Sequence, residues 1–160
     1  MLTYIAGMYE ADREAQLNAA LELVFHGFRS LTARPDRILE SRGLQRVHHR
    51  ILYFVGRNPD LTVGGLLAIL HVSKQALNAP LRQLLEMRLV DSIPSTLDGR
   101  ARLLRLTGDG VRLEKILSGT QRKHLDKVFA QAGVPAETGW RLVMGLLSRD
   151  HSETGEANLT

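Results

Sequence analysis

The segment from Ser92 to Gly110 constrains the fold of this chain more than any other stretch. It reads as a short strand, a polar turn and a second strand that ends where a helix starts. Asp98-Gly99 indicates a tight hairpin turn, because glycine adopts the positive φ that two-residue turns demand. Basic residues follow that turn at near-alternating spacing: Arg100, Arg102 and Arg105. A basic hairpin of this kind is typical of a wing that lies beside DNA.

Positive charge is concentrated in the same part of the chain. The 160 residues carry a net charge of +4, but residues 44–107 hold nine basic and four acidic side chains, a net +5. The rest of the sequence is slightly acidic. A basic excess confined to the central third is expected of a surface that meets a polyanion.

Several classes of protein are disfavoured by composition and motif content. The length suits one domain with a real core, and the absence of cysteine excludes disulfides and thiolate metal sites. No apolar run is long enough to span a bilayer, and the N-terminus lacks the basic start of a signal peptide, so we expect a cytoplasmic protein without membrane contact. No nucleophile triad, phosphate loop or paired-carboxylate pattern stands out, which predicts no enzyme, no catalytic residue and no cofactor.

Helical periodicity flanks the hairpin on both sides. The predicted helices span, in chain order, residues from about 9 to 33, 44 to 57, 63 to 70, 74 to 88, 109 to 130 and 136 to 148. We expect Pro35 to end or interrupt the first helix, and Gly133 with Pro135 to separate the last two. Thr107 suits the N-cap of the helix after the hairpin. Residues 149–160 are polar and without periodicity, which predicts a frayed tail.

The helices at 63–70 and 74–88, joined by His71-Val72, predict a helix-turn-helix whose second helix enters the major groove. Its candidate DNA contacts are Ser73 and Lys74 at the N-terminus, where amides attract phosphate, and the base readers Gln75, Asn78 and Arg82. These last three point away from the leucines of the same helix, and such side chains pair with adenine and guanine edges. Pro80 predicts a local kink, or alternatively a later start of the helix, although Ser73 is a good N-cap.

Three histidines invite a test for a metal site. His48 and His49 are adjacent on a helix and point about 100° apart, so they cannot chelate one ion as residues four apart do. No acid or cysteine is placed to complete a set with them or with His71. We therefore expect surface or interface histidines and no metal.

Motifs at consistent mutual spacing resemble those of the MarR family of bacterial winged-helix regulators. They are Ser73-Lys-Gln-Ala-Leu, Leu84-Leu-Glu-Met-Arg-Leu-Val90, Asp98-Gly-Arg100 and Leu106-Thr-Gly-Asp-Gly110. The resemblance covers about residues 44–117. It implies a mainly α fold with a small β-hairpin wing, in which a winged helix-turn-helix lobe (44–108) lies between an N-terminal dimerisation helix (1–43) and C-terminal dimerisation helices (109–148), with a flexible tail (149–160).

The resemblance also implies a function. It predicts a homodimeric transcription regulator of the repressor type that binds a pseudo-palindromic operator in double-stranded DNA. Arg100 would enter the minor groove, Arg102 would add a phosphate contact, and Arg105 would pair with an acid nearer the domain body. A small-molecule effector bound among the first, second and fifth helices would release the DNA.

Two alternatives remain open at this stage. The terminal helices could fold back on one core instead of forming a dimer. The domain could also be a winged-helix module for protein–protein assembly without sequence-specific DNA binding, although such a module would not need three wing arginines.

Overall fold

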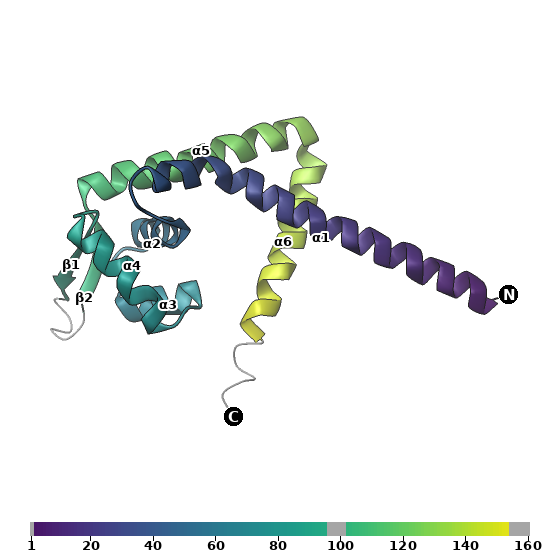
Figure 1. Ribbon diagram of the computed structural model, residues 1–160, viewed down its shortest axis with the longest axis horizontal. Coiled ribbons are helices and arrows are strands. Elements are labelled where there is room, and N and C mark those ends of the chain that lie inside the picture. The colour runs from purple at the N-terminus through teal and green to yellow at the C-terminus, as the bar shows by residue number, and fades with distance from the viewer. Residues whose placement is uncertain (1, 96–101, 154–160) are drawn as a thin grey trace, which may run out of the picture. The chain divides into compact units, whose positions relative to one another are not determined.

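The computed structural model describes residues 2–95 and 102–153 of the chain. Its elements are α1 (Leu2–Glu40), α2 (Arg46–Arg57), α3 (Val63–Leu70), α4 (Lys74–Glu86), β1 (Val90–Pro94), β2 (Arg102–Leu106), α5 (Gly108–Ala132) and α6 (Val134–Glu153) (Figure 1). A mainly α chain with one antiparallel hairpin is the fold class expected from the sequence. The chain divides into two compact units, residues 1–121 and 122–160.

Pro35 does not end the first helix, so that expectation was wrong. α1 continues through Pro35 to Glu40. A proline inside a helix removes a hydrogen bond and costs roughly 3 kcal/mol. The continued turn places Pro35 and Leu39 in the core with almost no exposed surface, and this apolar burial offsets the penalty.

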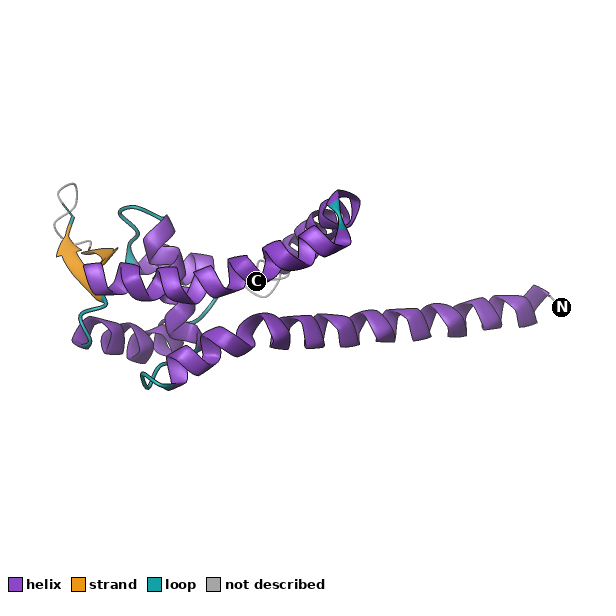
Figure 2. Ribbon diagram, turned by 90° about the horizontal axis from the view of Figure 1, so that it is seen from above, coloured by secondary structure: helices purple, strands orange, loops and turns teal. Residues whose placement is uncertain are grey.

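The long N-terminal part of α1 takes no part in that core. Every side chain from residue 12 to residue 30 is exposed within the protomer. Figure 2 shows this part of the helix extending well beyond the other elements of the first unit. Its exposed side chains include large apolar ones, among them Leu17, Leu21, Val24 and Phe25.

Gly43 stops α1 and directs the chain into α2. It has a φ of +68°, in the left-handed region that favours glycine. Its N–H donates to the carbonyl of Glu40 at 3.0 Å, and the N–H of Leu44 donates to the carbonyl of Leu39 at 2.9 Å. These two bonds form a Schellman motif, and the buried leucines 39 and 44 make the apolar contact that accompanies it.

The helix-turn-helix follows the prediction closely. Thr62 accepts a hydrogen bond from the N–H of Gly65 and caps α3, while Ser73 accepts one from the N–H of Ala76 and caps α4. His71 joins the two helices with a φ of +50°. α4 is helical through Pro80, so the later start was the wrong alternative, and the kink remains a prediction.

The strands of the hairpin pair in antiparallel register, from Val90 opposite Leu106 to Pro94 opposite Arg102. Leu103 of β2 also bridges to Thr62, and the N–H of Leu104 donates to the carbonyl of Leu61 at 2.8 Å. The hairpin is therefore fastened to the start of α3. Asp98-Gly99 and Arg100 lie outside the described residues.

The core of the first unit gathers around α2. Ile51, Leu52 and Val55 of this helix are buried with residues of every neighbouring element: Leu39, Leu44, Leu61, Leu66, Leu77, Leu81, Leu84, Leu89, Val90, Leu104, Leu113 and Leu117. Thr107 caps α5 as predicted, because its hydroxyl accepts a hydrogen bond from the N–H of Gly110 at 3.0 Å.

The second unit contains the end of α5 and the whole of α6. Gly133, with a φ of +86°, separates these helices, and Pro135 lies in the first turn of α6 as expected. α6 continues past Ser148 to Glu153, where a frayed tail was expected. No glycine or proline stands between Ser148 and Gly155, so nothing local ends the helix there. Among helices formed by the described residues, none combines the length and apolarity that a membrane crossing requires.

Candidate nucleic-acid interface

The outer face of α4 carries the predicted base readers. Gln75, Asn78 and Arg82 are exposed, while Leu77, Leu81 and Leu84 of the same helix are buried in the core. Leu85 of the same helix is only partly covered. Burial of one leucine stripe fixes the rotation of the helix, so the polar face is turned to solvent over the length of α4.

The N-terminus of α4 places two further candidates beside that face. Ser73 is occupied as the N-cap, with its hydroxyl 3.2 Å from the N–H of Ala76. Lys74 follows it as the first residue of the helix and is exposed. Arg82 lies 3.8 Å from Glu86 in an exposed pair, and such surface pairs contribute little stability.

The wing arginines have different surroundings. Arg105 pairs with Asp60 at 2.9 Å, as expected for a residue near the domain body. Arg102 is exposed and donates from Nε to the hydroxyl of Ser92 at 2.8 Å and from Nη2 to the Ser92 carbonyl. These bonds hold Arg102 along the hairpin. Arg100, the candidate for the minor groove, lies outside the described residues.

Contacts at the base of the hairpin join it to α4 and α5. The hydroxyl of Thr107 donates to the carbonyl of Arg88 at 2.7 Å, and the Thr107 N–H donates to the carbonyl of Leu89 at 3.2 Å. Gly110 packs so closely that a Cβ on it would lie 1.9 Å from the same Leu89 oxygen. β1 packs against α4 (Figure 1), so this junction positions the wing beside the recognition helix.

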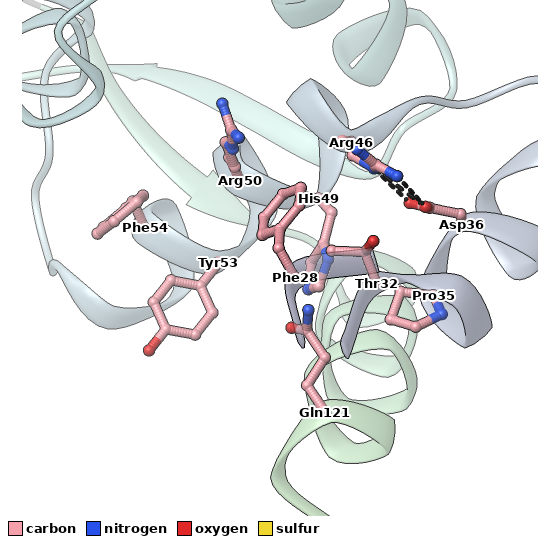
Figure 3. Close-up of a pocket in the computed structure, with 10 residues that line it drawn as sticks. All are labelled: Phe28, Thr32, Pro35, Asp36, Arg46, His49, Arg50, Tyr53, Phe54 and Gln121. Carbon is pink, nitrogen blue, oxygen red and sulfur yellow. Dashed lines mark hydrogen bonds and ion pairs between the residues drawn. The ribbon is translucent and has the colours of Figure 1, made fainter. Parts of the chain in front are cut away.

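A pocket lies in the first unit, among α1, α2 and the middle of α5, the three helices among which an effector was expected to bind. Its volume is about 240 Å³. We call it the aromatic pocket and define it by its lining residues, shown in Figure 3: Phe28, Thr32, Pro35, Asp36, Arg46, His49, Arg50, Tyr53, Phe54 and Gln121. Four of these, Arg46, His49, Arg50 and Tyr53, recur at steps of three or four along α2. That spacing places the four residues on one face of α2, and it is the sequence pattern from which this wall of the pocket could have been predicted.

His48 and His49 are buried, so the expectation of surface positions for them was wrong. The N–H of Gln45 donates to Nδ1 of His48 at 2.9 Å, and Nε2 of His49 lies 3.0 Å from the Ser118 hydroxyl on α5. His49 thus lies in the interior of the first unit, between α2 and α5. Within the described residues, no group of three or more histidine, aspartate or glutamate side chains is arranged to hold a metal ion.

Burial lowers the pKa of both histidines below the ordinary value of 6.5. For His49, this effect outweighs the nearby carboxylates of Glu114 and Asp36, which act in the opposite direction. Between the lowered pKa and about 6.5, the unfolded chain binds more protons than the folded one. The contribution of these neutral histidines to the free energy of unfolding is therefore fully present above pH 6.5 and is lost as the pH falls below that value.

This linkage predicts a measurable pH dependence. The free energy of unfolding in urea should be lower at pH 5 than at pH 7.5, and His49→Gln should reduce the difference because glutamine stays neutral across that range. His124→Gln, on an exposed part of α5, is the matched control. An equal pH dependence in wild type and His49→Gln would contradict the assignment to His49.

Comparison with known proteins agrees with this geometry. A family model described as MarR family matches residues 42–101. The HTH-type transcriptional regulator PetP of Rhodobacter capsulatus is 41% identical over 131 residues, which cover 82% of this chain and 79% of that protein.

Solved structures show the same fold. A MarR family transcription regulator has a TM-score of 0.72 at 20% identity, covering 91% of this chain and 97% of that one. The S. aureus MepR–DNA complex has a TM-score of 0.64 at 16% identity, covering 82% and 96%. A Mycobacterium tuberculosis MarR family protein in complex with salicylic acid has 0.55 at 24% identity, covering 78% and 93%. Together with the family-model match and the identity to the Rhodobacter regulator, the winged helix-turn-helix shows that this chain belongs to the MarR family of transcriptional regulators.

Proposed function

We propose that this regulator is a homodimeric repressor that binds a pseudo-palindromic operator and leaves it when a small aromatic acid binds. The observation that carries the proposal is the polar face of α4, with exposed Gln75, Asn78 and Arg82 on a helix whose opposite face is locked into the core. A regulator of this kind acts where chromosomal DNA is found, in the cytoplasm.

In this proposal, α4 enters the major groove and the hairpin lies along the adjacent minor groove. Gln75, Asn78 and Arg82 read base edges, and Ser73 and Lys74 bind phosphate. Arg102 adds a wing contact to phosphate, and Arg100 enters the minor groove, where the negative potential favours arginine. MepR, a neighbour in fold, has been crystallised on DNA, which supports this mode of binding.

Dimerisation is proposed from apolar surface that the protomer leaves uncovered. α1 exposes Leu17, Leu21, Val24 and Phe25 on one face, and α6 exposes Trp140, Leu142, Val143, Leu146 and Leu147. Apolar surface gathered on one helix face indicates an interface. We assign residues 1–43 and 109–148 to dimerisation and 44–108 to DNA binding. Two-fold symmetry would then place the two α4 helices in successive major grooves, about 34–36 Å apart.

The aromatic pocket is the proposed effector site. Phe28, Tyr53 and Phe54 supply apolar walls. Asp36 and Arg46 neutralise each other, and among the described residues Arg50 has no carboxylate partner, so the lining carries one net positive charge. An aromatic monocarboxylate matches both properties. The complex of the tuberculosis protein with salicylic acid supports this choice of ligand class.

Arg82→Ala tests the recognition helix directly. Loss of a bidentate base contact costs about 1–3 kcal/mol, so affinity for DNA upstream of the gene should fall roughly 10-fold, and discrimination against unrelated DNA should weaken. Lys74→Ala should instead weaken binding to all sequences and reduce the slope of log affinity against log salt by about one. Binding is measured by fluorescence anisotropy across a salt series.

Arg37→Ala is the matched control, because Arg37 is an exposed arginine of α1 outside the helix-turn-helix. Binding that does not depend on salt, or that is unchanged by Arg82→Ala and Lys74→Ala, would favour the protein–protein assembly module instead.

A further inference from the structure

One buried hydrogen-bond donor in the first unit lacks a proper partner. His48 of α2 is 3% exposed and does not line the aromatic pocket. Its Nδ1 accepts a hydrogen bond from the N–H of Gln45 at 2.9 Å, so the neutral ring carries its proton on Nε2. Nε2 is buried and makes no hydrogen bond of normal geometry with any described residue. An unpaired buried N–H destabilises a fold and is rare in native proteins.

The side-chain amide of Gln83 on α4 is the group that acts on this donor. α2 packs against α4. Burial lowers the pKa of His48, and the Gln83 side chain acts in the opposite direction, as a hydrogen-bond acceptor does. The amide nitrogen of Gln83 donates to the carbonyl of Gly43 at 3.0 Å. The amide oxygen, Oε1, is therefore the atom of Gln83 that can accept from His48.

Gln83 stands next to Arg82, in the half of α4 that follows Pro80. Consecutive residues of a helix point about 100° apart, so Arg82 is exposed while Gln83 reaches the turn at Gly43. Pro80 has no N–H for the carbonyl of Ala76, so one of the hydrogen bonds that would join the two halves of α4 is missing. A base contact by Arg82 that rotates the second half of α4 by a small angle also moves Gln83.

We propose that His48 is a specificity-determining positioning residue, whose Nε2–H completes a hydrogen bond to Oε1 of Gln83 only when Arg82 binds its correct base pair. The inference rests on the proposed function, because it takes α4 as the helix that reads DNA. On unrelated DNA, phosphate contacts hold the protein without fixing the rotation of α4, and the donor stays unpaired. On the correct sequence the bond forms in a site closed to water and strengthens binding. Because specificity is a difference of affinities, His48 increases it without touching DNA.

Two substitutions at position 48 separate this role from a purely structural one. In His48→Asn, the amide oxygen takes the place of Nδ1 and accepts from the N–H of Gln45, but no donor remains at the position of Nε2. In His48→Gln, the amide nitrogen reaches that position and restores the donor. His48→Asn should lower the ratio of affinities for a selected and an unrelated duplex about 10-fold, whereas His48→Gln should keep the wild-type ratio.

The selected duplex is the one that wild-type protein binds most tightly from a random-sequence pool, and the unrelated duplex has the same length. Both affinities are measured by anisotropy on the full chain at one salt concentration. A variant that is only less folded loses the same factor on both duplexes, so its ratio does not change. An unchanged ratio in His48→Asn, or the same loss in His48→Gln, would overturn the inference. Wild-type protein that yields no preferred duplex would overturn the proposed function itself.

Gln83→Met tests the partner of His48. Methionine has nearly the length of glutamine but no amide oxygen. This variant should lower the ratio by at least the factor found for His48→Asn, and the double variant should lose no more than Gln83→Met alone, because both changes remove the same bond. Losses that multiply in the double variant would show that the two side chains act separately, which would overturn the inference.

Proton NMR observes the bond directly. The resonance of the proton on Nε2 of His48, assigned by its absence in His48→Asn, should move downfield when the selected duplex is added and should keep its position with the unrelated duplex. The same shift with both duplexes, or no shift with either, would also overturn the inference.

Discussion

Replacing Gly110 with alanine is expected to lower the free energy of unfolding by about 3 kcal/mol or more, the upper range for overpacking. The new methyl group would lie 1.9 Å from the carbonyl oxygen of Leu89 and 3.0 Å from its carbon. Because both atoms belong to the backbone, the clash can be relieved only by moving α5 away from the end of α4. That movement would also break the hydrogen bond from Thr107 to Leu89. Urea denaturation followed by circular dichroism measures the change.

Gly64→Ala is the matched control for Gly110→Ala. Gly64 is an exposed glycine inside α3, and a methyl group there would lie 3.8 Å from the Thr62 hydroxyl oxygen, an ordinary contact. This substitution should raise the free energy of unfolding by roughly 0.5–1 kcal/mol, since alanine favours helix. A Gly110→Ala protein as stable as wild type would show that the close packing against Leu89 is not needed for the fold.

Leu21→Glu is expected to convert the proposed dimer to monomer and to weaken operator binding about 100-fold or more. Leu21 is 68% exposed in the protomer, so the fold should be unaffected. In a dimer interface the carboxylate would be buried without a partner, at a cost of several kcal/mol. A monomer binds one half-site. It therefore loses the 10²–10⁴-fold increase in affinity that comes from binding two linked half-sites at once. Sedimentation measures the oligomeric state, and anisotropy the affinity.

Ala19→Glu places the same charge on the opposite face of α1, where the side chain is also exposed. It should remain dimeric and bind operator normally. A Leu21→Glu protein that stays dimeric would contradict the assignment of this apolar face to dimerisation.

The recognition lobe could be predicted from sequence because its signals are local. Thr62 and Ser73 each cap a helix by accepting a hydrogen bond from the N–H three residues later in the chain. The leucine spacing of α4 determines which face of that helix is buried. Arg105 was expected to pair with an acid, and it does so with Asp60.

The errors lie where distant contacts override local signals. Pro35 is a helix breaker by propensity, yet burial in the core holds it inside α1. His49 is polar, yet Ser118, 69 positions away, gives it a partner in the interior. The aromatic pocket combines residues of three helices, from Phe28 to Gln121, so no single segment contains its pattern. The roles of the individual DNA-contact residues remain predictions.

The uncovered N-terminal part of α1 has a consequence for gene dosage. A helix without tertiary contacts gains little stability in water, so in the proposed dimer this part of α1 would depend on the partner subunit for its order. Folding of the segment and pairing of subunits would then be one concentration-dependent step. The abundance of active repressor would rise with roughly the square of the amount of free chain, which gives the regulated promoter a threshold instead of a proportional response.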